Sequence, residues 1–161
     1  MLGMNTDPTT TQLTIEFCIS PDWFQTIRRL IFTVSIQCGF NERDSGQITM
    51  AVDEALANIH THGYHFDSTG KIVLTIHTHI DPTSRIDIQL DDETNNVDLD
   101  SIRSRDLEDI RPGGLGVHLI RTIMDESKWS KLQSGGIRLF LSKTQSRRKQ
   151  SKETICEKTN E

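Results

Sequence analysis

Two residues four positions apart, Glu54 and Asn58, have side chains suited to phosphate chemistry. They lie in residues 47–64, where apolar residues recur at helical spacing, so both should leave the same face of a helix one turn apart. A carboxylate can take a proton or orient a water molecule, and an amide oxygen can hold a hard cation such as magnesium. The pair therefore fits magnesium-assisted phosphate chemistry, although amphipathic helices also carry Glu and Asn on solvated faces for no catalytic reason.

A glycine-rich turn is the second candidate element. Gly113, Gly114 and Gly116 come directly before an apolar-striped segment that should be a helix, residues 117–126. Glycines let backbone N–H groups approach an anion, and the start of a helix adds positive partial charge. The turn lacks the Gly-Lys-Ser/Thr sequence of a Walker loop and the glycine spacing of a dinucleotide fingerprint. It fits either a phosphate cradle or a plain tight turn before a helix.

A third candidate, the acidic run of residues 91–96, directly follows an expected strand. Periodicity indicates the elements that must position all three candidates. The central helix should end near Gly63, where a residue without a Cβ relieves strain at a helix C-terminus. An earlier helix, capped by Ser20, should begin at Pro21 and turn Trp23 inward. The expected strands cover residues 12–19, 71–79, 85–90, 127–132 and 137–142, and the expected helices cover residues 21–38, about 47–63 and 117–126.

The order of these elements predicts the fold class. One strand, two helices, a hairpin, the glycine-rich turn with its helix, and two final strands form an α+β fold. The expected architecture is a two-layer α/β sandwich with helices on one face of a mixed or antiparallel sheet. Residues 1–11 should be a disordered lead, residues 12–142 a single domain, and residues 143–161 a charged, disordered tail.

Composition narrows the possible functions. The chain of 161 residues has a formal net charge of -5, which disfavours direct binding to nucleic acid. No apolar run approaches the roughly 20 residues that span a bilayer, and no signal-peptide pattern opens the chain, so no membrane contact is expected. Three widely spaced cysteines without a Cys-x-x-Cys motif indicate a reducing, cytoplasmic setting.

Taken in order, the three candidate elements resemble the GHKL ATPase superfamily. The motifs that carry the resemblance are Glu54-x-x-x-Asn58, His62-Gly63-Tyr64, Asp92-Glu93 and Gly114-Leu115-Gly116, the last on a helix that ends at Met124-Asp125-Glu126. Within the superfamily, the sequence is most similar to the anti-sigma-factor serine kinases of the RsbW and SpoIIAB type. The likeness spans about residues 12–142.

The resemblance implies a Bergerat-type, HATPase_c-like fold that binds ATP and Mg²⁺ between the helical layer and a lid, residues 98–112. It assigns Glu54 as the general base and Asn58 as the magnesium ligand. It assigns Asp92 as the acceptor for the adenine amino group, with Asp91 as an open alternative. The residues that would wrap the phosphates are Gly113, Gly114, Leu115 and Gly116.

The resemblance also implies a function. The protein would be a serine/threonine protein kinase that phosphorylates a small anti-anti-sigma antagonist of the STAS type and sequesters an alternative sigma factor. The family likeness further suggests a homodimer. Arg29 would lie at the partner surface, with Arg28 as the alternative one position earlier.

Thr94 departs from the family pattern, because it stands at the glycine of an Asp-x-Gly box that lines the base of the nucleotide. If that position has a left-handed backbone, a β-branched residue there is strained by about 1–2 kcal/mol. A loss of about 1.4 kcal/mol weakens binding tenfold, and the side chain would also crowd the adenine. The alternative function is therefore a regulatory binding module of the same fold, with weak or absent nucleotide binding, acting through partners alone.

Overall fold

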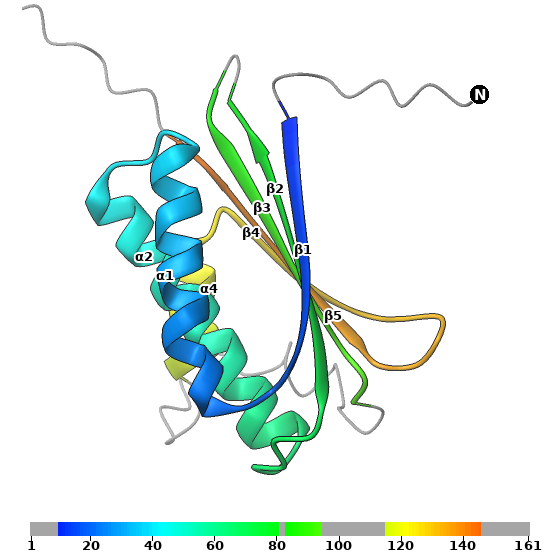
Figure 1. Cartoon of the computed structure of the whole chain (residues 1–161). Helices are drawn as coiled ribbons and strands as arrows, with labels where there is room; N and C mark the ends of the chain where they lie inside the picture. The colour runs from blue at the N-terminus through cyan, green and yellow to red at the C-terminus, as the bar shows by residue number, and fades with distance from the viewer. Residues whose placement is uncertain (1–9, 81–82, 95–114, 146–161) are drawn as a thin grey trace, which may run out of the picture.

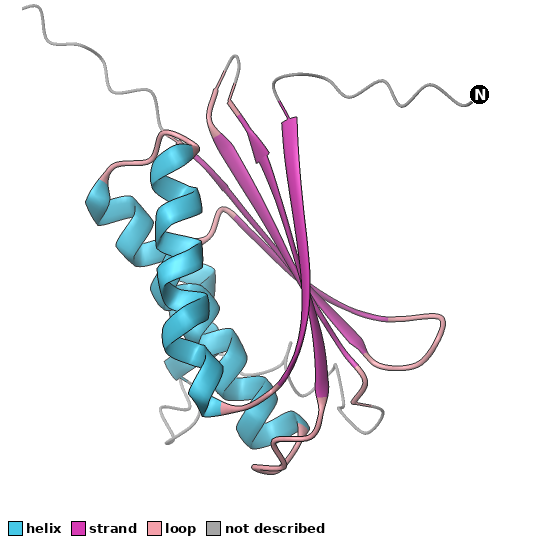
Figure 2. Ribbon diagram, viewed as in Figure 1, coloured by secondary structure: helices cyan, strands magenta, loops and turns pink. Residues whose placement is uncertain are grey.

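The computed structural model describes residues 10–80, 83–94 and 115–145, which form two layers. Figures 1 and 2 show the helices together on one side of a twisted sheet, with no described helix on the other side. The expected α+β two-layer sandwich is confirmed. The sheet within the described chain is antiparallel rather than mixed, because each pair of neighbouring strands runs in opposite directions.

Five strands make the sheet, in the order β1-β2-β3-β5-β4. The central strand is β3, and its register places Asp92, at its end, opposite Ile72 of β2 and Ile137 of β5. The carboxyl end of β3 is therefore enclosed by strands on both sides. The strand bounds are β1 (Thr10–Cys18), β2 (Lys71–His79), β3 (Arg85–Asp92), β4 (Glu126–Lys131) and β5 (Ile137–Thr144).

The helical layer consists of α1 (Pro21–Gln37), α2 (Glu42–Asn58) and α4 (Leu115–Ile123), and α2 continues into a π-helical turn, η1 (Ile59–Gly63). Helix α2 lies in the middle, because it packs against both α1 and α4. It begins five residues before the expected position 47. The reason is a side-chain cap: Asn41 Oδ1 accepts a hydrogen bond from the Asp44 backbone N–H at 2.9 Å.

The hydrophobic core fills the space between the layers and follows the expected periodicities. Alternate residues of β2 and β3 are buried, and α1 contributes Ile27 and Ile31. The expected inward position of Trp23 is wrong, because 49% of its surface is exposed. Phe24 takes the inward place instead, since it lies three and seven residues before Ile27 and Ile31 on the same face of the helix.

Helix α4 ends at Ile123, so the expected helical end at Glu126 is wrong. The Asp125 backbone N–H donates to the Ser142 carbonyl at 2.9 Å, and its carboxylate accepts from the Thr144 N–H at 2.8 Å. These bonds to β5 take the backbone out of the helix. The chain therefore turns directly into β4 at Glu126.

Two boundaries differ from the expected domain limits. Strand β1 begins at Thr10, within the expected lead of residues 1–11, and β5 runs to Thr144, within the expected tail of residues 143–161. Residues 1–9 and 146–161 lie outside the described residues. None of the helices in the described ranges has the length and apolar character needed to cross a membrane.

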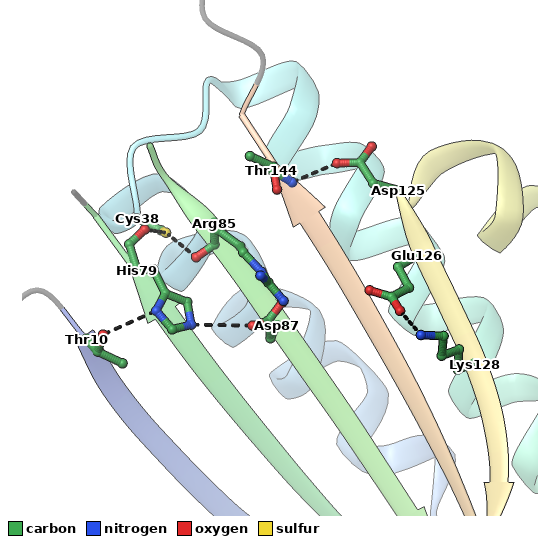
Figure 3. A network of polar contacts seen from close by, with 9 residues as sticks. All are labelled: Thr10, Cys38, His79, Arg85, Asp87, Asp125, Glu126, Lys128 and Thr144. Carbon is green, nitrogen blue, oxygen red and sulfur yellow. Dashed lines mark hydrogen bonds and ion pairs between the residues drawn. The ribbon is translucent and has the colours of Figure 1, made fainter. Parts of the chain in front are cut away.

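A network of polar contacts lies at the end of the sheet where β3 begins (Figure 3). Asp87 accepts a hydrogen bond from Arg85 Nε at 2.8 Å and pairs with His79 Nε2 at 3.4 Å. The other ring nitrogen of His79 lies 3.2 Å from the Thr10 hydroxyl. At the C-terminal end of α1, the Cys38 thiol donates to the Arg85 carbonyl at 3.3 Å, and burial raises the pKa of this thiol. Each of these groups has a structural partner.

Candidate functional site

Glu54 and Asn58 lie on the face of α2 that meets α4, and Gly116 of α4 lies against both side chains. A Cβ added to Gly116 would lie 2.7 Å from Oε2 of Glu54 and 3.1 Å from Nδ2 of Asn58. The first distance is shorter than real Cβ contacts, so any side chain at this position would displace the carboxylate. Glu54 and Asn58 are both half-buried. Residues of two motifs that are far apart in the sequence, Glu54 and Asn58 in one and Gly116 in the other, are therefore neighbours in space.

The glycine-rich turn is only partly described. Helix α4 begins at Leu115, two residues before the expected start at 117, so Leu115 and Gly116 are part of the helix. Gly113, Gly114 and the expected lid at residues 98–112 lie outside the described residues. Through Gly116, the first turn of α4 lies beside the Glu54–Asn58 face. The first N–H groups of a helix have no partner within the helix, so they are available to an anion at this place.

Asp92, the last residue of β3, is buried with 5% of its surface exposed. Its Oδ1 accepts hydrogen bonds from the Thr94 backbone N–H, at 2.8 Å, and from the Thr94 hydroxyl. Burial raises the pKa of the Asp92 carboxyl, and hydrogen bonds from Thr94 and from the Ile137 backbone partly oppose the rise. No cation in the described ranges pairs with it. Asp92 is thus a buried carboxylate surrounded by neutral donors, which is a common property of functional sites.

Thr94 does not have the strained backbone that the family pattern suggested. Among the described non-glycine residues, only His65 and Phe66 have positive φ angles, 50° and 69°. The left-handed backbone that would strain a threonine at this position is therefore not present. The residue is 8% exposed, and its methyl group faces Gly63: a Cβ added there would lie 3.0 Å from Cγ2 of Thr94. Gly63 does not have a positive φ either, so the predicted relief of helix-end strain is wrong, and the limited space beside Thr94 explains the glycine.

Tyr64 is a site residue to which the sequence analysis gave no role. Its hydroxyl accepts a hydrogen bond from the Glu93 backbone N–H at 2.9 Å and donates to the Lys71 carbonyl at 3.2 Å. Its own N–H donates to the Ile59 carbonyl at 2.9 Å, the last bond of the π-helical turn. Burial raises the pKa of the Tyr64 phenol. Tyr64 thereby ties the end of α2 to the end of β3; the only signal in the sequence was its place directly after Gly63.

Asp91 lies on the opposite face of the sheet from Asp92, because neighbouring residues of a strand alternate between faces. Arg138 holds Asp91 with two hydrogen bonds, both of 2.7 Å, one to each carboxylate oxygen. The hydrogen bonds that Arg138 donates to Asp91 raise the pKa of the Arg138 guanidinium. Between the two candidates for the base acceptor, the geometry therefore favours Asp92.

The two candidate arginines at the partner surface differ in their contacts. Arg28 Nε donates to Asp53 Oδ1 at 2.7 Å, which links α1 to α2 one residue before Glu54. Arg29 is exposed, and no ion pair holds it within the described chain. Arg28 thus has a structural partner, whereas Arg29 faces solvent with its charge available to another molecule.

Comparison with known proteins gives the class to which this fold and this site belong. A family model for the histidine kinase-like ATPase domain matches residues 20–143, most of the chain. The chain belongs to this family. The two-layer fold described above is thus that of a histidine kinase-like ATPase domain.

Curated relatives narrow the likeness. The chain is 27% identical over 144 residues to the serine-protein kinase RsbW of Halalkalibacterium halodurans, covering 84% of this chain and 83% of that protein. It is 25% identical over 125 residues to the serine-protein kinase RsbW of Listeria innocua, covering 73% of this chain and 78% of that protein. The expected resemblance to GHKL proteins of the RsbW serine-kinase type is confirmed by these matches.

Two solved structures have a similar fold. The RsbU and RsbW domains of a Mycobacterium tuberculosis protein match with a TM-score of 0.58 and 19% identity over 84% of this chain, which spans 33% of that chain. The SiaB–SiaC complex from Pseudomonas aeruginosa matches with a TM-score of 0.53 and 14% identity, over 82% of this chain and 89% of that chain. At these identities, the likeness shows the fold alone.

Proposed function

We propose that this protein is an ATP-dependent serine/threonine protein kinase of the anti-sigma-factor type. The observation that carries the proposal is the convergence of Glu54, Asn58 and Gly116 at the start of α4. A proton acceptor, a cation ligand and exposed backbone N–H groups are the parts that phosphoryl transfer requires, since its catalysis consists mainly of positioning and charge neutralisation. The names of the RsbW relatives support the same reading.

The residues fit a magnesium–nucleotide complex on two observations. Gly116 leaves open the space that a side chain would fill beside Glu54 and Asn58. At the end of β3, Asp92 offers a buried acceptor suited to an amino group of a base. Asn58 would hold Mg²⁺ through its amide oxygen, and the bound ion supplies neutralisation of phosphate charge.

Glu54 has the role of general base in this proposal. Its carboxylate takes the proton of a seryl or threonyl hydroxyl on the protein substrate, whose oxygen forms a bond to the γ-phosphorus. The bond between that phosphorus and the ADP oxygen breaks, and ADP leaves. The backbone N–H groups at the start of α4 hold the phosphates during the transfer.

The partners and setting follow from the same proposal. The protein substrate is a small anti-anti-sigma antagonist of the STAS type, and the unphosphorylated antagonist competes with an alternative sigma factor for this protein. Arg29, on the exposed face of α1, contributes to that partner surface. The protein acts in the cytoplasm as a homodimer.

Transfer of labelled phosphate from ATP to a cognate antagonist tests the function. Glu54→Gln should reduce transfer by about 10²–10⁴-fold, because it removes the proton acceptor while keeping the shape of the side chain. Its affinity for ATP should stay close to that of the wild type. Glu42→Gln makes the same change in the first turn of the same helix and should leave transfer unchanged. If the Glu54→Gln variant still transfers phosphate at the wild-type rate, Glu54 is not the general base.

A pair of glycine substitutions tests the phosphate cradle. Gly116→Ala puts a methyl group 2.7 Å from the Glu54 carboxylate and should weaken ATP binding and transfer at least about tenfold. Gly46→Ala, in α2, meets nothing within 4 Å. It should leave binding unchanged and raise the free energy of unfolding by about 0.5–1 kcal/mol, because alanine favours the helix. If Gly116→Ala and the wild type bind ATP with equal affinity, Gly116 is not part of the nucleotide-binding site.

A second candidate function rests on Thr94. Its hydroxyl and backbone N–H both donate to Oδ1 of Asp92, whose carboxylate is the proposed acceptor for the base. If these bonds exclude the nucleotide, the protein is a regulatory module that acts through partner binding alone. Calorimetric titration with magnesium and ATP distinguishes the two functions: heat of binding below millimolar nucleotide supports the kinase, and its absence supports the binding module.

A further inference from the structure

The end of β3 holds a carboxylate with an unusual set of donors. Asp92 is 5% exposed, and its Oδ1 accepts both the backbone N–H and the hydroxyl of Thr94. A carboxylate has about four lone-pair positions, so Oδ2 keeps capacity for further donors. The carboxylate therefore has one oxygen anchored to the protein chain and another that can accept from a ligand.

The residue that supplies the anchor is itself fixed. Thr94 is 8% exposed, and its methyl group lies against the backbone of Gly63. The residue between Thr94 and Asp92, Glu93, donates its N–H to the Tyr64 hydroxyl at 2.9 Å. The turn at the end of β3 is thus held from the side of η1. Rotation of the Thr94 side chain away from Asp92 would also move its methyl group out of the contact with Gly63.

We propose that Thr94 is a positioning residue for nucleotide recognition: its hydroxyl fixes the Asp92 carboxylate so that Oδ2 accepts the amino group of an adenine base. This inference rests on the proposed function, and it reverses the expectation that Thr94 only crowds the base. A glycine at position 94 would still offer its backbone N–H to Asp92. What the threonine adds is the second donor and the packing against Gly63.

The chemistry of the site explains why a second donor is useful. Burial raises the pKa of the Asp92 carboxyl, and the charge of Asp91 raises it further. The donors that lower it are Thr94 and the Ile137 backbone, and no cation in the described residues assists them. The Thr94 hydroxyl therefore helps keep Asp92 ionised, and an ionised carboxylate accepts hydrogen bonds with both oxygens.

Three substitutions at position 94 separate the hydroxyl from the shape of the side chain. Thr94→Val keeps the shape and removes the hydroxyl, Thr94→Ser keeps the hydroxyl and removes the methyl group, and Thr94→Gly removes both. Two quantities are measured for each variant. The first is the pKa of the Asp92 carboxyl in the nucleotide-free protein, by carbon-13 NMR. The second is the ratio of affinities for ATP and inosine triphosphate, whose base has a carbonyl oxygen in place of the amino group.

Thr94→Val should raise the pKa of Asp92 and reduce the preference for ATP over inosine triphosphate about fivefold, the effect of one hydrogen bond. Thr94→Ser should match the wild type in both quantities. If the wild type binds ATP and Thr94→Val leaves both quantities unchanged, this inference is overturned and the proposed function stands. Tighter ATP binding by Thr94→Gly, with Thr94→Val equal to wild type, would show that the side chain only crowds the base. Failure of the wild type to bind ATP would overturn the proposed kinase and this inference together.

Discussion

The two ends of strand β3 carry buried carboxylates in opposite situations. At its start, Asp87 has Arg85 at 2.8 Å and His79 at 3.4 Å, and His79 is itself held by Thr10 (Figure 3). At its end, Asp92 accepts hydrogen bonds from neutral groups only, within the described chain. Both residues are below one tenth exposed.

The different partners of the two carboxylates indicate different roles: Asp87 contributes to the stability of the fold, and Asp92 belongs to the candidate functional site. Burying a charge costs free energy unless a partner compensates it, and Asp87 has two partners, Arg85 on its own strand and His79 on β2. Asp92 has no such partner among the residues that the structure describes, so this part of the fold bears the cost of burying it. Proteins depart from such consistency mainly at functional sites, and the shifted pKa of Asp92 agrees with that rule.

The largest effect on stability should come from Asp87→Asn. This change weakens the bonds to Arg85 and His79, whose side chains are 45% and 36% exposed, so solvent screening reduces the loss to about 1–2 kcal/mol in the free energy of unfolding. The matched control is Glu126→Gln, which breaks the more exposed pair with Lys128. It should cost less than about 0.5 kcal/mol, as measured by urea denaturation. Equal losses in the two variants would contradict the structural role of Asp87.

Asp92→Asn should raise the free energy of unfolding rather than lower it, and the size of this gain should depend on pH. The pKa of Asp92 in the folded protein lies above its unfolded value, so the folded state binds more protons in the interval between the two values. The free energy of unfolding of the wild type therefore falls as the pH rises from the unfolded pKa through the folded pKa. Asparagine does not titrate, so the variant should gain stability relative to the wild type as the pH rises from the unfolded pKa of Asp92 through its folded pKa. Parallel pH profiles of the two proteins would contradict the assignment of Asp92 as an uncompensated charge.

Tyr64→Phe should have a smaller effect. It removes the acceptor of the Glu93 N–H and the donor to the Lys71 carbonyl, both at the partly exposed surface of the turn. Urea denaturation should show a loss of about 1 kcal/mol, the usual net value of such bonds. An unchanged midpoint would show that the turn at the end of β3 is held by Thr94 and Gly63 without the tyrosine.

Local patterns predicted the regular part of the site well. The spacing of Glu54 and Asn58 placed both on one helical face, and the expected helix after the glycines is present as α4, whose Gly116 lies beside that face. These predictions held because a helix fixes the direction of its side chains through its period alone. The alternation of β2 and β3 likewise predicted their buried faces.

The irregular part of the site could not be predicted in the same way. The backbone of Thr94, the reason for Gly63 and the double role of the Tyr64 hydroxyl depend on contacts between β3 and η1, which are far apart in the sequence. The family pattern suggested strain at Thr94 because it assumed the conformation of a glycine. Trp23 was assigned inward because a helical stripe does not say whether its first residue still lies over the sheet.

A crystal structure with Mg²⁺ and a non-hydrolysable ATP analogue tests the central claim most directly. The account predicts the metal on the amide oxygen of Asn58, the γ-phosphate within reach of Glu54, and the phosphates against the first turn of α4 at Gly116. It also predicts the amino group of the base on Asp92. Phosphates bound away from Gly116, or a metal that does not contact Asn58, would contradict it.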